Sequence, residues 1–534
     1  MIRAEMTAQL GSQDGPWDVC IIGGGATGLG AAVDAASRGY KTILLEQFDF
    51  AKGTSSRSTK LVHGGVRYLQ QGNIKLVMEA LHERGILKKN APHLVKNQSF
   101  IVPNYKWWEG PFYGIGLKIY DWMSGSLGLG PSQFLSKDET LQRAPTLDAE
   151  GLKGSVLYHD GQFDDARLAI NLAQTASENK AVVLNYFPVV GLLKQHEKIT
   201  GVSAHDSLND KKYEIKAKAI INATGVFTDS ILKMDDDASA PVISPSQGVH
   251  IVLDKEFLPG ESAIMVPHTD DGRVLFAVPW HNKIIIGTTD TPVETASPEP
   301  VAMEEEINFI LEQIGKYLSK IPTRSDIRSV FAGLRPLVKA SGKKTAALSR
   351  DHLIAVSDSG LITITGGKWT TYRRMAEDVI DVAIEKSGLA TSKCNTADLQ
   401  IHGAQQTADF SAPLYYYGTD IEKITSLIEK EKTLGEAIHP NLPYIKAEII
   451  WAVKHEMCMT VEDALSRRTR ALLLDAQAAI ECAPLVAFLM AKEMRKDDDW
   501  QKNQIEIFNE LAKKYVVTDK DRPQKLAESE KEFI

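Results

Sequence analysis

The segment that most constrains the fold is a glycine-rich turn near the N-terminus, placed between two apolar stretches. Val19–Ile22 is typical of a buried strand, and residues 29–38 have the composition of a helix. Between them, Gly23, Gly25 and Gly28 follow the G-x-G-x-x-G spacing. Glycines in this spacing allow a tight turn, close approach of the backbone to a pyrophosphate, and close packing of helix on strand. The pattern therefore predicts a dinucleotide site, with the pyrophosphate at the helix N-terminus.

The next strand supports this prediction. Ile43–Leu45 is a second apolar run, and Glu46 follows it directly. In Rossmann-like units an acidic residue at this place accepts hydrogen bonds from an adenosine ribose. A glycine-rich turn that binds nothing is the simpler alternative, but strand, turn, helix, strand and acid together favour a nucleotide. These residues alone do not distinguish FAD from NAD.

Composition and charge exclude several other classes of protein. The chain has 534 residues, 43% of them hydrophobic, and a formal net charge of −8. It is long enough for two or three domains, and its overall charge gives no attraction to nucleic acid. We find no secretory signal, and no run approaches the roughly 20 apolar residues of a spanning helix. The four cysteines form no C-x-x-C pair, so neither a disulfide framework nor a metal site is indicated.

Two later strands also end in glycine. The apolar run 219–222 is followed by Gly225, and the run 361–365 by Gly366 and Gly367. A helix is predicted over 371–386, so the second of these forms another possible start for an anion-binding helix. Both glycine turns favour a flavin nucleotide over NAD, although an NAD-linked dehydrogenase is a formal alternative.

Motifs spread over residues 18–377 resemble those of the FAD-dependent glycerol-3-phosphate dehydrogenases, respiratory enzymes of the D-amino-acid-oxidase-like flavoprotein group. They are GGGATG (23–28) with Glu46, TSSRSTKLVHGGVRYL (54–69), APHL (91–94), DDARL (164–168), NATG (222–225), GVHIV (248–252), GTTD (287–290), GLRPL (333–337), SRDH (349–352) and GGKWTTYRRMAE (366–377). The C-terminal TVEDALSRRTR (460–470) is similar to the family as well.

The resemblance implies a reaction. FAD is the expected cofactor, sn-glycerol 3-phosphate the substrate, dihydroxyacetone phosphate the product and a quinone the electron acceptor. Related oxidases instead pass electrons to oxygen and form hydrogen peroxide, but they carry an insertion for which 351–366 leaves no obvious room. A third interpretation is a flavin-binding, membrane-associated protein that catalyses no reaction. The resemblance leaves monomer and homodimer open, and it implies peripheral attachment at the cytoplasmic side of the inner cell membrane.

The order of the elements, together with this resemblance, predicts an α/β architecture. A Rossmann-like FAD-binding domain should contain an inserted, mostly antiparallel substrate-binding sheet, and an α-helical domain should follow. We expect a loose leader at 1–17, the oxidoreductase region at 18–393 and the helical domain at 394–534. The FAD-binding segments are expected at about 18–90, 151–235 and 346–390, and the substrate-binding segments at about 91–150 and 236–345.

The resemblance also assigns roles to residues of the substrate pocket. His250 and His63 are the candidate proton acceptors, since an imidazole titrates near neutral pH, and His250 is slightly favoured. Arg335 is expected to hold the C2 oxygen and stabilise negative charge that develops there. The remaining substrate-binding candidates are Arg67, Tyr68, Arg350 and Lys368. The cations of Arg67, Arg350 and Lys368 suit a phosphate dianion.

A further group is expected to bind FAD. Its members are Gly23, Gly24, Gly25, Gly28 and Glu46 at the adenosine end, Thr54, Ser55 and Ser56 near the pyrophosphate or ring, and Gly225, Gly366 and Gly367 along the isoalloxazine. Lys368 is an alternative partner for the reduced flavin ring rather than for the phosphate, and the sequence does not separate the two roles.

One segment suggests contact with a membrane. Residues 105–123, YKWWEGPFYGIGLKIYDWM, are rich in tryptophan and tyrosine, which favour the headgroup region of a bilayer. The segment is too short to span the bilayer but can form an amphipathic helix in the interface plane. The alternative is an aromatic helix packed on the protein's own core.

Overall fold

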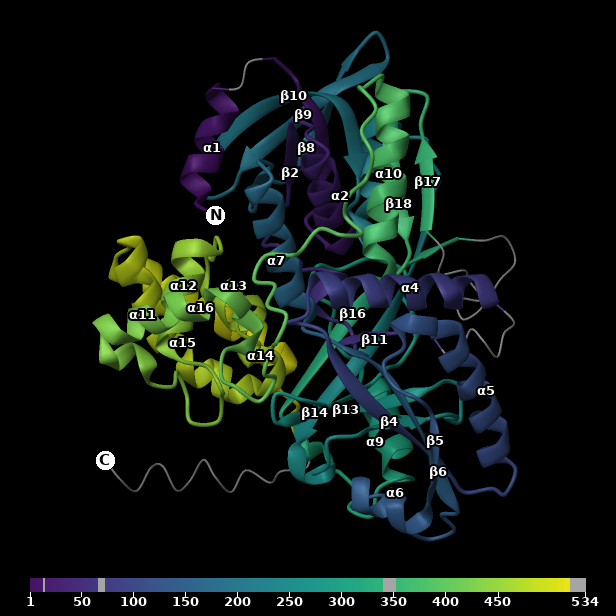
Figure 1. Ribbon diagram of the computed structural model, residues 1–534. Coiled ribbons are helices and arrows are strands. Elements are labelled where there is room, and N and C mark those ends of the chain that lie inside the picture. Colours follow the sequence, from purple (N-terminus) through teal and green to yellow (C-terminus); the bar gives the residue numbers. More distant parts are fainter. Residues whose placement is uncertain (13–14, 66–72, 340–351, 519–534) are drawn as a thin grey trace, which may run out of the picture.

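The computed structural model describes residues 1–12, 15–65, 73–339 and 352–518. Two β-sheets and a group of helices make up the molecule (Figure 1). In that view the first sheet lies at the top, the second at the lower right, and the C-terminal helices at the left. The α/β architecture, the inserted sheet and the helical C-terminal part predicted from the sequence are confirmed.

The first sheet carries the glycine-rich turn. Its main strand order is β17–β18–β10–β1–β2–β7, and all neighbours on this path run parallel except β17 and β18. Parallel sheets need cover on both faces, which is why β1 and β2 are apolar almost throughout. The strands are β1 (Trp17–Ile22), β2 (Thr42–Leu45), β7 (Val182–Leu184), β8 (Val189–Gln195), β9 (Lys198–Asp206), β10 (Lys211–Asn222), β17 (His352–Val356) and β18 (Leu361–Gly366).

Three helices pack with this sheet: α2 (Ala26–Ser37), α7 (Asp165–Glu178) and α10 (Tyr372–Ser387). The helix α2 contacts both others and is built from small residues. A Cβ atom on Gly30 would lie 2.8 Å from the ring of Tyr372, so this glycine sets the close approach of α2 and α10.

The second sheet is mostly antiparallel and supplies the far wall of the site. Its main order is β15–β11–β14–β13–β12–β4–β6–β3, with β16 beside β11 and β5 beside β6. The strands are β3 (Leu61–Val62), β4 (Lys96–Asn104), β5 (Gln133–Ser136), β6 (Gly154–Gln162), β11 (Ile243–Asp254), β12 (Ala263–Val266), β13 (Leu275–Trp280), β14 (Lys283–Gly287), β15 (Thr291–Pro292) and β16 (Ser329–Val338). Its helices are α4 (Ile74–Asn90), α5 (Glu109–Ser124), α6 (Lys137–Arg143) and α9 (Glu304–Gly315), whereas α8 (Thr228–Asp235) contacts β8 and β18 of the first sheet.

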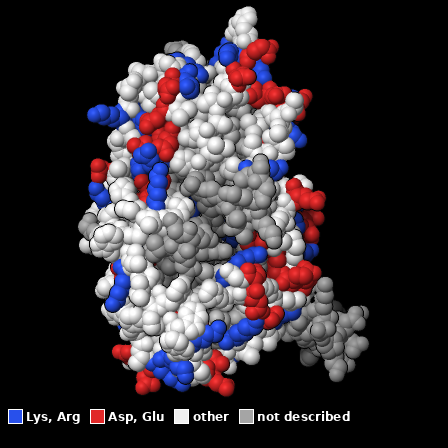
Figure 2. Space-filling view, turned by 90° about the vertical axis from the view of Figure 1, so that its right-hand side faces the viewer, with Lys and Arg blue, Asp and Glu red and all other residues white. Residues whose placement is uncertain are grey.

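The aromatic segment forms α5, which has two different faces. Tyr113, Leu117 and Tyr120 are buried against the second sheet and α4. The outer side is apolar yet exposed, and its large members are Trp107, Trp108, Phe112, Ile115, Ile119 and Trp122. Figure 2 looks at the molecule from the side on which α5 lies in Figure 1, and charged side chains are most frequent toward the edges of that view.

The C-terminal part begins after α10 and is helical. Thr460 caps the short helix α13, and its side chain accepts a hydrogen bond from the Asp463 amide, which forms a capping box. The helices are α11 (Ile421–Lys430), α12 (Lys446–His455), α13 (Val461–Asp463), α14 (Ala471–Leu474), α15 (Ala476–Met494) and α16 (Asp498–Ala512).

The expected loose leader is not loose where the structure describes it. Residues 3–12 form α1 (Arg3–Ser12), which packs against β7. The Arg3 guanidinium donates to Asp206 at 2.7 Å and to the Asn185 carbonyl oxygen. Met6 is buried in the main core. These partners lie far along the chain, so the local sequence pattern gave no sign of them.

Buried ion pairs join the C-terminal helices to the first sheet. Asp49 accepts from Arg467 at 2.5 Å and from Arg468 at 2.7 and 2.8 Å, and none of the three side chains is more than 3% exposed. The two guanidinium groups keep the pKa of Asp49 below its usual range in spite of the burial. The carboxylate is therefore ionised across the neutral range, and the SRRTR segment is held against the loop after β2.

We predict that Asp49→Asn destabilises the protein by about 3–5 kcal/mol, because buried Arg468 would lose its nearest counterion and Arg467 would be left with Glu462 and Asp463. Urea denaturation followed by tryptophan fluorescence measures the effect. Asp398→Asn is the control, since Asp398 pairs with Lys89 at the surface and should leave the transition unchanged. Equal midpoints for Asp49→Asn and the unaltered protein would contradict the assignment.

Candidate active site

A cavity of about 510 Å³ lies between the two sheets. It starts at the glycine-rich turn and extends along the first sheet to β11 and β16 of the second. The segments that contribute most of its lining are 22–23, 25–27, 45–48, 51–55, 57–59, 223–227, 333–337 and 364–370. These segments include residues of five motifs that are separate in the sequence: GGGATG, TSSRST, NATG, GLRPL and GGKWTT.

At one end, the turn brings backbone amides to the cavity. Gly23 has φ +109°, and a Cβ atom there would lie 2.7 Å from the Ala223 carbonyl oxygen of the neighbouring strand connection. A Cβ atom on Gly28 would lie 1.9 Å from the Gly23 carbonyl oxygen, which explains the third glycine as a packing residue. Gly25 is the N-cap of α2 and makes no side-chain cap, so the first turn of the helix presents amides and a positive dipole end.

Glu46 lines the cavity beside this turn. Its carboxylate accepts hydrogen bonds from the amides of Gly24 at 2.6 Å and Phe48 at 2.9 Å. Burial raises the pKa of Glu46, while these two amides act in the opposite direction. The acid that the motif predicts is therefore in the cavity and fixed in orientation, and its bond to a ribose stays a prediction.

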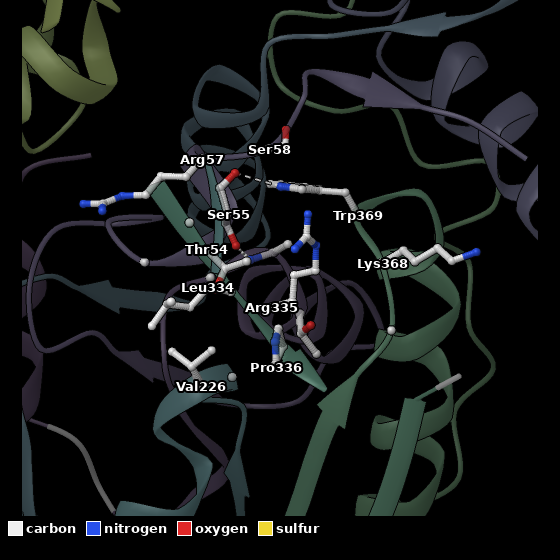
Figure 3. Close-up of a pocket in the computed structure, with 18 of the residues that line it drawn as sticks. Thr54, Ser55, Arg57, Ser58, Val226, Leu334, Arg335, Pro336, Lys368 and Trp369 are labelled. Carbon is white, nitrogen blue, oxygen red and sulfur yellow. Dashed lines mark hydrogen bonds between the residues drawn. The ribbon is translucent and has the colours of Figure 1, made fainter. Parts of the chain in front are cut away.

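The loop after β2 forms the middle of the cavity (Figure 3). Thr54 donates to the Leu334 carbonyl oxygen at 2.6 Å, and the Trp369 indole donates to the Ser55 carbonyl oxygen at 2.8 Å. Ser55 in turn accepts from the Ala26 amide at 2.9 Å. This short loop therefore connects α2, β16 and the segment after β18.

Not every residue expected at FAD faces the cavity. Thr54, Ser55, Gly225, Gly366 and Gly367 do line it. Gly24, Gly28 and Ser56 are not among the described residues of its lining. Gly24 faces Glu46, Gly28 packs on Gly23, and the Ser56 carbonyl oxygen accepts from Lys60 and Arg470, so these three support the site from behind.

Arg335 lies on β16 near the middle of the residues drawn in Figure 3, whereas Arg57 and Lys368 extend to opposite sides. Its guanidinium contacts Asp290 at 3.2 Å, Thr288 Oγ1 at 3.1 Å and the Thr289 carbonyl oxygen at 3.0 Å. A Cβ atom on Gly248 would lie 2.5 Å from Arg335 Nη2. The glycine of GVHIV therefore provides the space that the guanidinium of GLRPL occupies.

His250 lies on β11, two residues after that glycine, and also lines the cavity. Its ring stacks on Phe331 with centroids 4.8 Å apart, and Nε2 is 2.9 Å from Thr59 Oγ1. Burial, with smaller contributions from Lys60 and Arg335, holds the pKa of His250 well below its usual range. The imidazole is therefore neutral near pH 7, the form in which it can accept a proton.

His63 and Lys368 are the other described candidates, and both line the cavity. The His63 amide donates to Thr370 Oγ1 at 3.2 Å, and the next amide, of Gly64, donates to the Tyr120 hydroxyl at 2.7 Å. The HGG segment is thus anchored between the GGKWTT segment and α5. Arg67, Tyr68 and Arg350 lie outside the described residues, so their predicted roles are not placed.

Thr59, Asp290 and Trp369 are site residues that were not predicted from the sequence. Each stands inside a quoted motif, so the family resemblance was an available signal. Their roles depend on partners more than 40 residues away along the chain, namely His250, Arg335 and Ser55. Local spacing carries no information about such contacts.

Two family models match the chain. The model described as FAD dependent oxidoreductase matches residues 18–373, and the model described as the C-terminal domain of alpha-glycerophosphate oxidase matches residues 362–501. The chain therefore belongs to the FAD-dependent oxidoreductases, and its cofactor is FAD.

Relatives define the family more narrowly. The mitochondrial glycerol-3-phosphate dehydrogenase of Macaca fascicularis is 42% identical, over 94% of this chain and 73% of that protein. The mitochondrial enzyme of Homo sapiens is 42% identical, over 92% and 72%. Within the FAD-dependent class, the chain belongs to the glycerol-3-phosphate dehydrogenases.

Solved structures agree with this assignment. The glycerol-3-phosphate dehydrogenase of Bacillus halodurans, complexed with FAD, has a TM-score of 0.79 and 29% identity, and the match covers 98% of both chains. The L-alpha-glycerophosphate oxidase of Mycoplasma pneumoniae, with FAD bound, has a TM-score of 0.56 over 72% of this chain and 98% of that chain. Its identity is 18%, so this second likeness concerns the fold alone.

The cavity fits the cofactor that the family implies. The backbone at Gly23 leaves no room for a side chain, and the N-terminus of α2 opens on the cavity with its Ala26 amide bound to Ser55 Oγ, a setting that suits an anion. Gly25, Ser55 and Glu46 would hold the nucleotide end, and the glycines at 366–367 lie further along the same cavity.

We predict that Gly23→Ala lowers FAD content roughly tenfold or more, since a non-glycine residue at positive φ costs about 1–3 kcal/mol before any clash. FAD released on denaturation, measured per mole of protein, gives the result. Gly116→Ala is the control, because a Cβ atom there meets nothing within 4 Å. Circular dichroism confirms that both variants fold, and a folded Gly23→Ala with full FAD would show that the turn does not approach the cofactor.

Proposed function

We propose that the protein oxidises sn-glycerol 3-phosphate to dihydroxyacetone phosphate at FAD and passes the electrons to a quinone in a membrane. The observation that carries the proposal is the place of Arg335 and His250 together in the cavity that also contains the glycine-rich turn. The membership of the chain in the glycerol-3-phosphate dehydrogenases supports the choice of substrate.

Oxidation of a secondary alcohol needs a hydride acceptor, a proton acceptor and cations for the substrate phosphate. FAD, when bound, accepts the hydride from C2. Arg335 supplies donors that can stabilise charge on the C2 oxygen, and Asp290 with Thr288 fixes its guanidinium. Lys368 is the described cation that we assign to the phosphate, together with Arg67 and Arg350.

The proton is assigned to His250 rather than His63. His250 lies between Phe331 and the cavity, and its burial, with smaller contributions from Lys60 and Arg335, lowers its pKa and keeps it neutral at rest. During the reaction, the negative charge that forms on the substrate oxygen offsets the free-energy cost of protonating buried His250. The general base is thus available at neutral pH without titration of another group.

The Arg335→Leu variant should retain FAD, but the reduction of its flavin by glycerol 3-phosphate should be at least about 10²-fold slower. The reason is that an oriented hydrogen-bond donor to the developing negative charge is lost. The test is anaerobic mixing with substrate, followed by the visible absorbance of the flavin. Rapid bleaching of the unaltered protein is expected, and Arg143→Leu on the exposed side of α6 is the matched control. If the unaltered protein stays yellow, the proposed substrate is wrong. Normal bleaching in Arg335→Leu would exclude the assigned role.

Oxygen is the rival electron acceptor, and the name of the matching C-terminal family model, alpha-glycerophosphate oxidase, is the observation that favours it. Reoxidation of the same reduced protein distinguishes quinone from oxygen as the electron acceptor. Rapid reoxidation by a short-chain ubiquinone analogue and slow reoxidation by air support a dehydrogenase. Rapid formation of hydrogen peroxide in air supports an oxidase.

The outer side of α5 supports peripheral attachment to the membrane, which we place at its cytoplasmic face. Trp107 is 84% exposed and Trp122 83% exposed, at the two ends of the apolar side. Exposed apolar side chains in one continuous patch mark interaction surfaces, and tryptophan favours the headgroup region. Across the described part of the chain, no helix combines the length and apolar character needed to span a bilayer.

We predict that replacing both Trp107 and Trp122 by serine weakens binding to vesicles of phosphatidylethanolamine and phosphatidylglycerol roughly tenfold or more, given about 1.5–3 kcal/mol for burying a large apolar side chain. Co-sedimentation measures the bound fraction. Phe488→Ser removes another exposed ring, on α15, and should leave binding unchanged. Equal losses in both variants would argue against a specific role for α5.

A further inference from the structure

We propose that Thr59 is a proton relay, through which the C2 hydroxyl of the substrate transfers its proton to His250. The inference rests on the proposed function and deepens it, because it adds a residue to the reaction and changes how His250 reaches the substrate. Thr59 lines the same cavity as His250 and is half-buried, on the loop that follows β2.

The His250 ring has its Nε2 atom directed at Thr59. An imidazole nitrogen has one hydrogen-bonding direction in the ring plane. At Nε2 that direction is occupied by Thr59 Oγ1, 2.9 Å away. Nε2 therefore cannot bind a substrate hydroxyl directly while this contact is present.

The other ring nitrogen of His250 is enclosed by the protein. Nδ1 is buried and has no hydrogen-bond partner among the described residues. The strands on either side, paired with His250 at Gly287 and Phe331, close in on the ring. A Cβ atom on Gly287 would lie only 2.2 Å from His250 Cδ2. The ring is therefore held in one orientation, and a proton reaches it through Thr59 and Nε2.

Thr59 lies between two residues that are held in place by Asp165. Ser58 donates to Asp165 through its amide at 3.0 Å and its hydroxyl at 2.7 Å, and Lys60 donates to the same carboxylate at 2.7 Å. The residues on both sides of Thr59 are thus fixed by a fully buried acid. A hydroxyl group between two fixed neighbours can carry a proton along a defined path.

The transfer balances in atoms and electrons. The substrate O–H bond breaks as a new O–H bond forms on Thr59, while the original Thr59 O–H bond breaks as N–H forms on His250 Nε2. The electron pair left on the substrate oxygen becomes the second bond of the product C=O, and the C2–H pair departs in the hydride that FAD accepts. Thr59 returns as a neutral hydroxyl and His250 becomes the imidazolium. The charged groups facing this imidazolium are Lys60 and Arg335, which are paired with Asp165 and Asp290.

The test compares flavin reduction by glycerol 3-phosphate in the FAD-loaded protein. Thr59→Val keeps the shape and removes the hydroxyl, and it should slow reduction by about 10²-fold or more, the usual contribution of a proton-transfer group. Thr59→Ser restores a hydroxyl and should recover most of the rate. Thr363→Val is the matched control, because Thr363 is a buried strand residue on β18 outside the described lining of the cavity.

A double variant separates a relay from two independent effects. If Thr59 and His250 act in one path, Thr59→Val with His250→Asn should be no slower than the slower single variant. Losses that multiply would overturn the relay, as would a normal rate in Thr59→Val. Rapid bleaching of the unaltered protein tests the proposed function separately, so the two can fail independently.

A measurement independent of turnover covers variants that fail to load FAD. In protein labelled with ¹⁵N-histidine, the His250 signals are those absent from His250→Asn. The relay requires Nε2 to be the unprotonated, accepting nitrogen, with the proton on Nδ1. A proton on Nε2, donated to Thr59, would overturn the proposal without any assay of activity.

Discussion

The site depends most on the hydrogen bonds and ion pairs of the Asp165 carboxylate. One oxygen accepts from the amide and hydroxyl of Ser58 and from Lys60, and the other accepts from Arg470 at 3.2 Å. Burial lowers the pKa of Lys60 to about 8, and Asp165 opposes that shift. This single acid joins α7, the loop that lines the cavity and the C-terminal helices, so the alignment of Thr59 depends on all three. Asp49 provides a second such junction nearby through Arg467 and Arg468.

Much of the architecture could be predicted from local pattern. The glycine spacing and the apolar run before it specified the turn from β1 to α2, and the helix predicted over 371–386 agrees with α10 to within one residue at each end. What periodicity did not reveal was α1, whose contacts are with Asp206 and Asn185. A helix held by distant partners has no strong local signature, because tertiary contacts rather than propensity stabilise it.

The site was predictable to a similar degree. Arg335, His250 and Glu46 were selected as site residues from residue type and family motif, and all three line one cavity. The reasons for their geometry are pairwise and long-range. Gly248 is needed because Arg335 Nη2 fills the space beside it, and the orientation of His250 follows from Thr59. A single sequence contains both members of each pair but not the information that they meet.

The helix α1 has a consequence for how the molecule behaves at high concentration. β7 is the outermost strand on its side of the main path of the first sheet, and α1 packs against it. An open strand edge is a template on which another chain can add a strand, and cover by a helix is one way to prevent this. Arg3 fastens that cover to Asp206 and to the Asn185 carbonyl oxygen. We expect these ten residues, which are outside the described lining of the cavity, to limit edge-to-edge pairing of the sheet that carries the glycine-rich turn.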